Sequence, residues 1–230
     1  MKSLFIAIMA LVMVYTGTIS IVKADVSVER ARNLVHTMGM DISDFAAEEK
    51  DNMDQWFSGM TSLLKNYVSF DKISIFILGK KTWDKLSDEE QGLFINYMAY
   101  SLARNYGVSI GYNTETVTSM DVAFDVKRVV DIGKRGLVVS SVISYVRDMD
   151  SIPKELEVDI VVNGKNDEEA RIVDMIVEGI SSVITVRSLL NPIINGNGGI
   201  HAFLRSLPPD VRSETEHHTA PTGKIQNALN

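Results

Sequence analysis

The chain contains no cysteine, which excludes disulfide bonds, thiolate metal sites and cysteine nucleophiles. Histidine is scarce as well: His217 and His218 lie near the C-terminus, while His36 and His201 are isolated and lack the spacing of a metal-binding motif. Basic residues number 23 against 30 acidic ones, so the net charge of −7 disfavours nucleic acid as a partner. The sequence therefore predicts no metal, no cofactor and no nucleic-acid ligand.

Long apolar runs are missing from the chain except at its N-terminus. Lys2 precedes an apolar run from Leu4 to Val14, and Val22-Lys23-Ala24 places small residues where a signal peptidase cuts. We therefore expect residues 1–24 to be a signal peptide, cleaved after Ala24, and the rest of the chain to be exported. Because apolar residues continue through Val22, an uncleaved membrane anchor is the alternative. Removing residues 1–24 changes the net charge from −7 to −9.

The first half of the remaining chain shows the period of amphipathic helices. Gly39 is a candidate helix stop, and Ser87 with Glu90 forms a capping box in which each residue satisfies the other's backbone N–H. We expect helices at residues 28–38, 53–67, 71–78 and 87–106.

After Gly107 the apolar period changes to two, and β-branched residues become frequent. Short turns join the successive runs, which indicates an antiparallel meander. Leu156, Val158 and Ile160 alternate with acidic residues, so one face of this sheet is expected to be apolar. The sequence predicts an α+β domain at 25–207, with strands at 122–132, 137–147, 155–163 and 170–177, a final helix at 181–194, and a disordered polar tail at 208–230.

Patterns that carry catalysis are largely missing from the chain. Asp174 and Glu178 interrupt the apolar end of the last predicted strand. A curved sheet capped by helices could hold them in a pocket as acid and base, so an exported enzyme is one alternative. The glycines around Gly198 follow a predicted helix and fit a helix stop better than a phosphate-binding loop.

Two blocks of residues resemble a known family in their order and spacing. The first comprises Phe70-Asp71-Lys72-Ile73, Leu78-Gly79, Trp83, Ser87, Glu90-Gln91, Phe94, Leu102 and Tyr106. The second comprises Ile172 to Ser181, Arg187-Ser188, Gly198-Gly199 and Leu204. Both resemble segments of the MlaC family of toluene-tolerance, phospholipid-transport proteins. Together with the predicted signal peptide, the resemblance spans nearly all of the mature chain.

The chain departs from the family pattern at two positions. Ala170-Arg171 stands where family members often have Trp before Lys-Val, and Leu189-Leu190 replaces the usual Gln-Phe after Arg187-Ser188. These departures leave the fold implied by the resemblance intact, but they concern the shape of the pocket and therefore the identity of the ligand.

The resemblance implies N-terminal helices followed by an antiparallel four-stranded, NTF2-like sheet with a C-terminal helix, enclosing an apolar pocket. It also implies a periplasmic phospholipid carrier of an ABC transport system that maintains outer-membrane lipid asymmetry, and not an enzyme. Its partners would be an outer-membrane lipoprotein and porin complex and an inner-membrane MCE-protein ABC transporter. A carrier that meets two membrane complexes in turn works most simply as a monomer.

A diacyl lipid needs an apolar cavity that is open at one end, so that its headgroup stays in water. Arg147 or Arg187 could pair with a lipid phosphate, although a surface salt bridge is the alternative for each. The apolar faces expected to converge on the acyl chains include Phe76, Ile77, Trp83, Phe94, Met98, Val139, Ile143, Val158, Ile160, Val173 and Ile176.

Three other interpretations stay open at the level of sequence. A sister branch of the family is associated with hopanoids, so the ligand could be a different apolar molecule. An exported NTF2-like enzyme would use Asp174 or Glu178. An interaction module would pack its apolar helices fully and leave no cavity.

Overall fold

The computed structural model describes residues 25–47, 53–109, 122–145, 154–196, 198–209 and 211–212. The predicted signal peptide, residues 1–24, and residues 213–230 of the predicted tail lie outside these ranges. Among the described residues, no helix combines the length and the hydropathy that crossing a bilayer requires.

Helices occupy the first half of the chain and return after the sheet. The start of α6 is confirmed as a capping box: the backbone N–H of Ser87 donates to Glu90 Oε2 at 3.0 Å, and that of Glu90 donates to Ser87 Oγ at 3.2 Å. The helices are α2 (Val28–Ala47), α3 (Met53–Tyr67), α4 (Phe70–Leu78), α5 (Lys80–Trp83), α6 (Asp88–Ser109), α7 (Ser182–Ile194) and α8 (Gly199–Arg205).

The sheet is an antiparallel meander of five strands in the order β1-β2-β3-β4-β5. The prediction of four strands is therefore wrong by one. Glu178 and Gly179 both have positive φ, 52° and 79°, and form a two-residue turn that pairs Val177 with Ile180. The chain thus forms a short fifth strand before the last helices begin. The strands are β1 (Val122–Asp131), β2 (Leu137–Tyr145), β3 (Lys154–Asn163), β4 (Arg171–Val177) and β5 (Ile180–Ser181).

Strand β4 contains an irregularity that changes which side chains face inward. Val161 pairs with Asp174, but the next residue of β3, Val162, pairs with Ile172, so one residue of β4 has no partner. Beyond this point Met175 lies opposite Ile160, whose side chain belongs to the apolar face of the sheet. The alternation of inward and outward side chains along β4 is therefore interrupted near its middle.

Helix α2 is longer than predicted, because it does not stop at Gly39 but continues to Ala47. A β-carbon at Gly39 would lie 2.5 Å from the Phe124 side chain of β1. On the other side of α2, a β-carbon at Gly59 of α3 would lie 2.6 Å from the Phe45 ring. Both glycines therefore permit a close approach that any larger residue would prevent.

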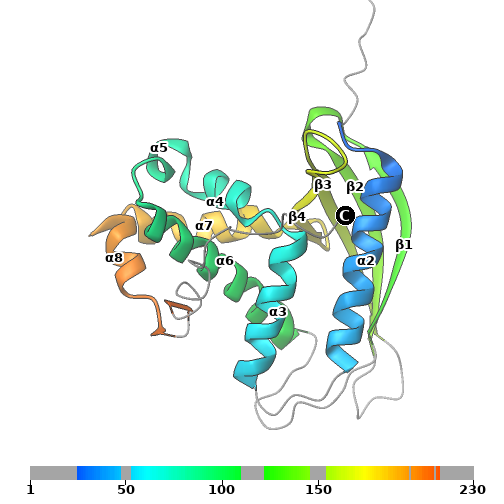
Figure 1. The fold of residues 1–230 in the computed structure, drawn as a ribbon, viewed down its shortest axis with the longest axis horizontal. Helices are drawn as coiled ribbons and strands as arrows, with labels where there is room; N and C mark the ends of the chain where they lie inside the picture. The colour runs from blue at the N-terminus through cyan, green and yellow to red at the C-terminus, as the bar shows by residue number, and fades with distance from the viewer. Residues whose placement is uncertain are drawn as a thin grey trace, which may run out of the picture.

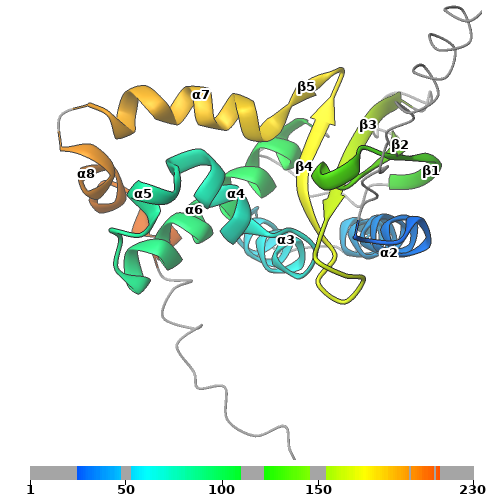
Figure 2. The same cartoon turned by 90° about the horizontal axis from the view of Figure 1, so that it is seen from above.

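The molecule has two parts that meet along β4 (Figure 1). Helix α2 covers β1 and β2 at one end, and α4 to α8 form a group of helices at the other, with α3 between them. Figure 2 shows α2 and α3 side by side, and α7 extending from β5 toward α8. The junction of α3 and α4 is fixed to β4, because the backbone N–H of Ser69 donates to the carbonyl oxygen of Ile172 at 2.9 Å.

Candidate ligand-binding cavity

An apolar cavity of about 410 Å³ lies between the sheet and helices α2, α3 and α6. This volume falls within the range of small-molecule sites, roughly 300–1,000 Å³. The lining residues are mainly aliphatic side chains and methionines, the latter able to adapt to ligands of different shape. They are Met38, Ile42, Trp56, Met60, Leu64, Val68, Ile73, Leu102, Ala103, Phe124, Ile143, Leu156, Val158, Ile160, Ile172, Asp174, Met175, Val177, Glu178, Ser182 and Val183.

The cavity has a buried end and a more exposed end. At the buried end Val68, Ile160 and Ile172 are 7%, 1% and 4% exposed. At the other end Leu156 and Val183 are partly exposed, and Glu178 is exposed. An apolar ligand would therefore place its most hydrophobic part near Ile160 and its polar part near Glu178.

Helices α2 and α3 form one wall of the cavity and are joined by a polar contact. The hydroxyl of Tyr67 donates to the carboxylate of Asp41. Burial, followed by this hydrogen bond and the negative charge of Asp41, raises the pKa of Tyr67 to about 12. The contact therefore helps to hold together the two helices that carry four of the lining residues, Met38 and Ile42 on α2 and Met60 and Leu64 on α3.

Polar groups gather at the exposed end, where β4, β5 and α7 meet. Asp174 Oδ2 accepts a hydrogen bond from the Ser181 hydroxyl at 2.6 Å, and Oδ1 accepts from the backbone N–H groups of Met175 at 2.8 Å and Val183 at 3.2 Å. Ser181 Oγ in turn accepts from the backbone N–H of Ile184 at 3.1 Å, as the N-cap of α7. These bonds satisfy N–H groups in the first turn of α7 that have no partner within the helix.

The family model of the MlaC protein matches residues 32–208. The chain belongs to the MlaC family. No curated protein sequence matches it. A solved structure of a phospholipid-binding protein from Ralstonia solanacearum, in complex with a phospholipid, aligns over 82% of this chain and 95% of that chain, with 14% identity and a TM-score of 0.43.

The second block of MlaC-like residues coincides with the polar end of the cavity. Asp174 and Ser181 form the hydrogen-bonded cap of α7, and Glu178-Gly179 is the turn with positive φ. This arrangement accounts for the residue types in the block. It also makes Asp174 less suited to act as a catalytic acid or base, because its two oxygens already accept hydrogen bonds from three donors.

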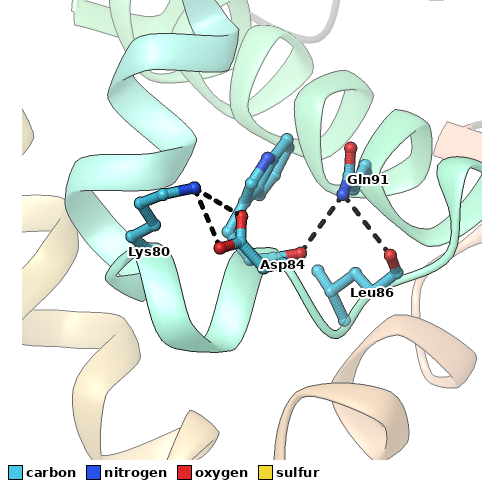
Figure 3. A network of polar contacts seen from close by, with 5 residues as sticks. Lys80, Asp84, Leu86 and Gln91 are labelled. Atoms are coloured by element: carbon cyan, nitrogen blue, oxygen red, sulfur yellow. Dashed lines mark hydrogen bonds and ion pairs between the residues drawn. The ribbon is translucent and has the colours of Figure 1, made fainter.

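The first block of MlaC-like residues builds the corner between α5 and α6. Figure 3 shows Gln91 directed at this corner, where its Nε2 donates to the carbonyl oxygens of Trp83 at 3.2 Å and Leu86 at 3.4 Å. Glu90 also contacts His201 of α8, at 2.5 Å from Nδ1. The backbone N–H of Ser87, and then this histidine, hold the pKa of Glu90 below its usual range. Gln91 and Glu90 of the block therefore fix the packing of helices, whereas Ile73 and Leu102 of the same block line the cavity.

The structure places the predicted lining residues in three different environments. Ile143, Val158 and Ile160 line the cavity. Val139 is fully buried in the core of the sheet, whereas Val173 and Ile176 are partly exposed and do not contact the cavity. Ile176 lies opposite Asp159 of β3, two residues from the exposed Glu157, because the irregularity in β4 directs Met175 and Val177 inward instead.

The predicted lining residues from the helices do not reach the cavity. Phe76 is 48% exposed, and the Arg187 guanidinium lies 4.8 Å from the centre of its ring, so Arg187 is engaged with α4. Arg147 lies outside the described residues. The others, Ile77, Trp83, Phe94 and Met98, are buried in the core formed by α4 to α8.

Sequence reasoning missed the contribution of α2 and α3 to the cavity. Met38, Met60 and Leu64 belong to apolar helical stripes, and such stripes normally mark ordinary core. Ile42 lies beyond Gly39 and was therefore excluded by the expected helix stop. Among the described residues, no group of His, Cys, Asp and Glu is arranged to hold a metal ion.

Proposed function

We propose that this protein is a periplasmic lipid carrier that holds the acyl chains of a phospholipid in the cavity between the sheet and α2, α3 and α6. The observation that carries the proposal is the cavity itself, which is apolar at its buried end and polar at its exposed end. A diacyl lipid changes in the same way along its length, from apolar acyl chains to a polar headgroup. Membership of the MlaC family supports the same ligand class.

As a carrier, the protein would receive lipid from one membrane complex and release it to another without chemistry. The resemblance implies an outer-membrane lipoprotein and porin complex and an inner-membrane MCE-protein ABC transporter as these partners. A role without catalysis is supported by Asp174, whose carboxylate is engaged in capping α7. Export requires the N-terminal segment, which we propose is removed after Ala24.

Native mass spectrometry of the exported protein, purified without detergent from cells that express the full chain, tests the proposal. We expect a mass that lacks residues 1–24 and carries one lipid, identified as a phospholipid after organic extraction. A hopanoid in the extract would replace phospholipid as the ligand. A ligand-free mass that persists after incubation with phospholipid vesicles would overturn the carrier function.

A matched pair of variants connects the bound lipid to this cavity. Met60→Gln introduces a polar group into the lining at similar length, whereas Met40→Gln makes the same change on α2 at a side chain that is 54% exposed and outside the lining. We expect the lipid-bound fraction to fall for Met60→Gln and to stay unchanged for Met40→Gln. Equal loss in both variants would place the lipid elsewhere.

A further inference from the structure

The first turn of α7 is held to the sheet by polar contacts as well as by Val183. Val183 is partly buried and packs against the core, but Ile184 is 59% exposed, so the apolar burial that secures this turn comes mainly from one side chain. Within α7 as a whole, Leu190 is the residue that is buried, and it lies two turns further along. The bonds from Ser181 and Val183 to the carboxylate of Asp174 therefore provide much of the attachment.

The same turn forms part of the exposed end of the cavity. Ser182 and Val183 line it together with Glu178, and Asp174 itself lies at its edge. Displacing the first turn of α7 from β4 would widen the cavity at the end where a ligand's polar part is expected. Because Asp174 holds this turn in place, it also affects how easily a ligand can enter or leave the cavity.

The backbone around Asp174 places its carboxylate for this contact. The carboxylate of Asp174 accepts the backbone N–H of Met175 next to the irregularity in β4, which fixes the side chain relative to the strand. The short β5 strand then brings Ser181 back opposite Ile176, within reach of the carboxylate. One carboxylate therefore joins three consecutive features: the irregular strand, the two-residue turn and the helix cap.

We propose that Asp174 is a positioning residue that sets the rate of lipid exchange, by holding the first turn of α7 against β4 with the help of Ser181. This inference rests on the proposed carrier function. It differs from a purely structural role, because weakening the cap is expected to change how fast lipid leaves as well as how stable the fold is.

The test measures transfer of fluorescent NBD-phosphatidylethanolamine from the loaded exported protein to acceptor vesicles. We expect Asp174→Asn and Ser181→Ala to accelerate release by roughly tenfold, the factor that corresponds to losing one such hydrogen bond. Ser181→Thr keeps the hydroxyl and should release lipid at the wild-type rate. Melting temperatures are recorded for every variant.

Ser87→Ala is the matched control, because it removes the same kind of N-cap from α6 and Ser87 is not among the cavity-lining residues. A lower melting temperature with unchanged release is expected for this variant. The inference is overturned if Asp174→Asn and Ser181→Ala bind lipid and release it at the wild-type rate, or if Ser87→Ala accelerates release equally. A wild-type protein that takes up no lipid contradicts the proposed function itself, which is a separate outcome.

Discussion

Phe94 and Met60 are both buried apolar side chains, but they border different interiors. Phe94 is fully buried against other rings, with its centroid 6.5 Å from that of Phe203, and Tyr97 lies 5.0 Å from Phe203. Met60 is also buried, at 5% exposure, but it borders a cavity of about 410 Å³. Burial of a side chain alone therefore does not distinguish a filled core from the wall of a cavity.

The difference arises from what each group of helices packs against. In the filled part, α6 meets α8, and aromatic rings from the two helices fill the space between them. In the open part, α2, α3 and α6 face a sheet whose inner side chains include Val158 and Ile160, which are too short to fill the space. Helices against helices thus give a packed core here, and helices against this sheet give a cavity.

Truncating one large side chain in each part gives the largest expected contrast. Phe94→Ala should lower the free energy of unfolding by about 3–5 kcal/mol, because it creates a new void in a filled core. Met60→Ala should cost about 2 kcal/mol in the lipid-free protein, since the side chain already lacks packing partners on its cavity side. Urea denaturation of both variants measures the difference. Equal losses would mean that the two interiors are filled alike.

Enlarging one small side chain in each part tests the same contrast by adding volume instead of removing it. Ala99 and Ala103 lie one turn apart on α6, both nearly fully buried, but only Ala103 belongs to the cavity lining. Ala99→Leu should destabilise the fold by about 1–3 kcal/mol through overpacking. Ala103→Leu should leave stability near that of the wild type and weaken lipid binding several-fold, as measured by vesicle uptake. Normal uptake by Ala103→Leu would argue against this cavity as the binding site.

The smallest expected effect concerns the contact between α2 and α3 in the wall of the cavity, and it can be measured by changing the pH. Tyr67 has a pKa of about 12 in the folded protein against an ordinary 10.0, so its contribution to stability is complete below pH 10 and is lost as the pH rises toward 12. We expect Tyr67→Phe to cost about 1 kcal/mol at pH 8 and to remove part of the alkaline loss. Denaturation curves of both proteins at pH 8 and pH 11 measure this. A parallel loss in the two proteins would contradict the assignment.

Much of the fold could be predicted from the sequence, because local patterns determine it. The capping box at Ser87 marks the start of α6, and alternation in Leu156, Val158 and Ile160 identifies the inner face of β3. The fifth strand escaped prediction because it has two residues, too few for a period. It depends instead on Glu178 adopting a positive φ, which is uncommon for a residue with a side chain.

The cavity was less accessible to sequence reasoning, since a cavity depends on how far apart elements lie and not on which residues are apolar. Trp83 and Phe94 were chosen because apolar faces were expected to converge on the acyl chains, but both are buried in the core, and the carbonyl oxygen of Trp83 belongs to the helix corner that Gln91 holds. Val173 and Ile176 were chosen because the sequence of β4 is apolar on both faces, and it does not show which side chains the irregular pairing near Asp174 directs inward. Long-range geometry of this kind leaves no local signal in a single sequence.

The two glycines that touch aromatic rings show how the size of the ligand space can be set from a distance. Neither Gly39 nor Gly59 belongs to the lining, yet each determines how near α2 lies to a neighbouring element. A methyl group at Gly39 would meet the base of the Phe124 side chain and would push α2 away from β1, whereas one at Gly59 would meet the tip of the Phe45 ring, which would have to move. The width of the cavity is therefore set partly at spacer positions that do not line it.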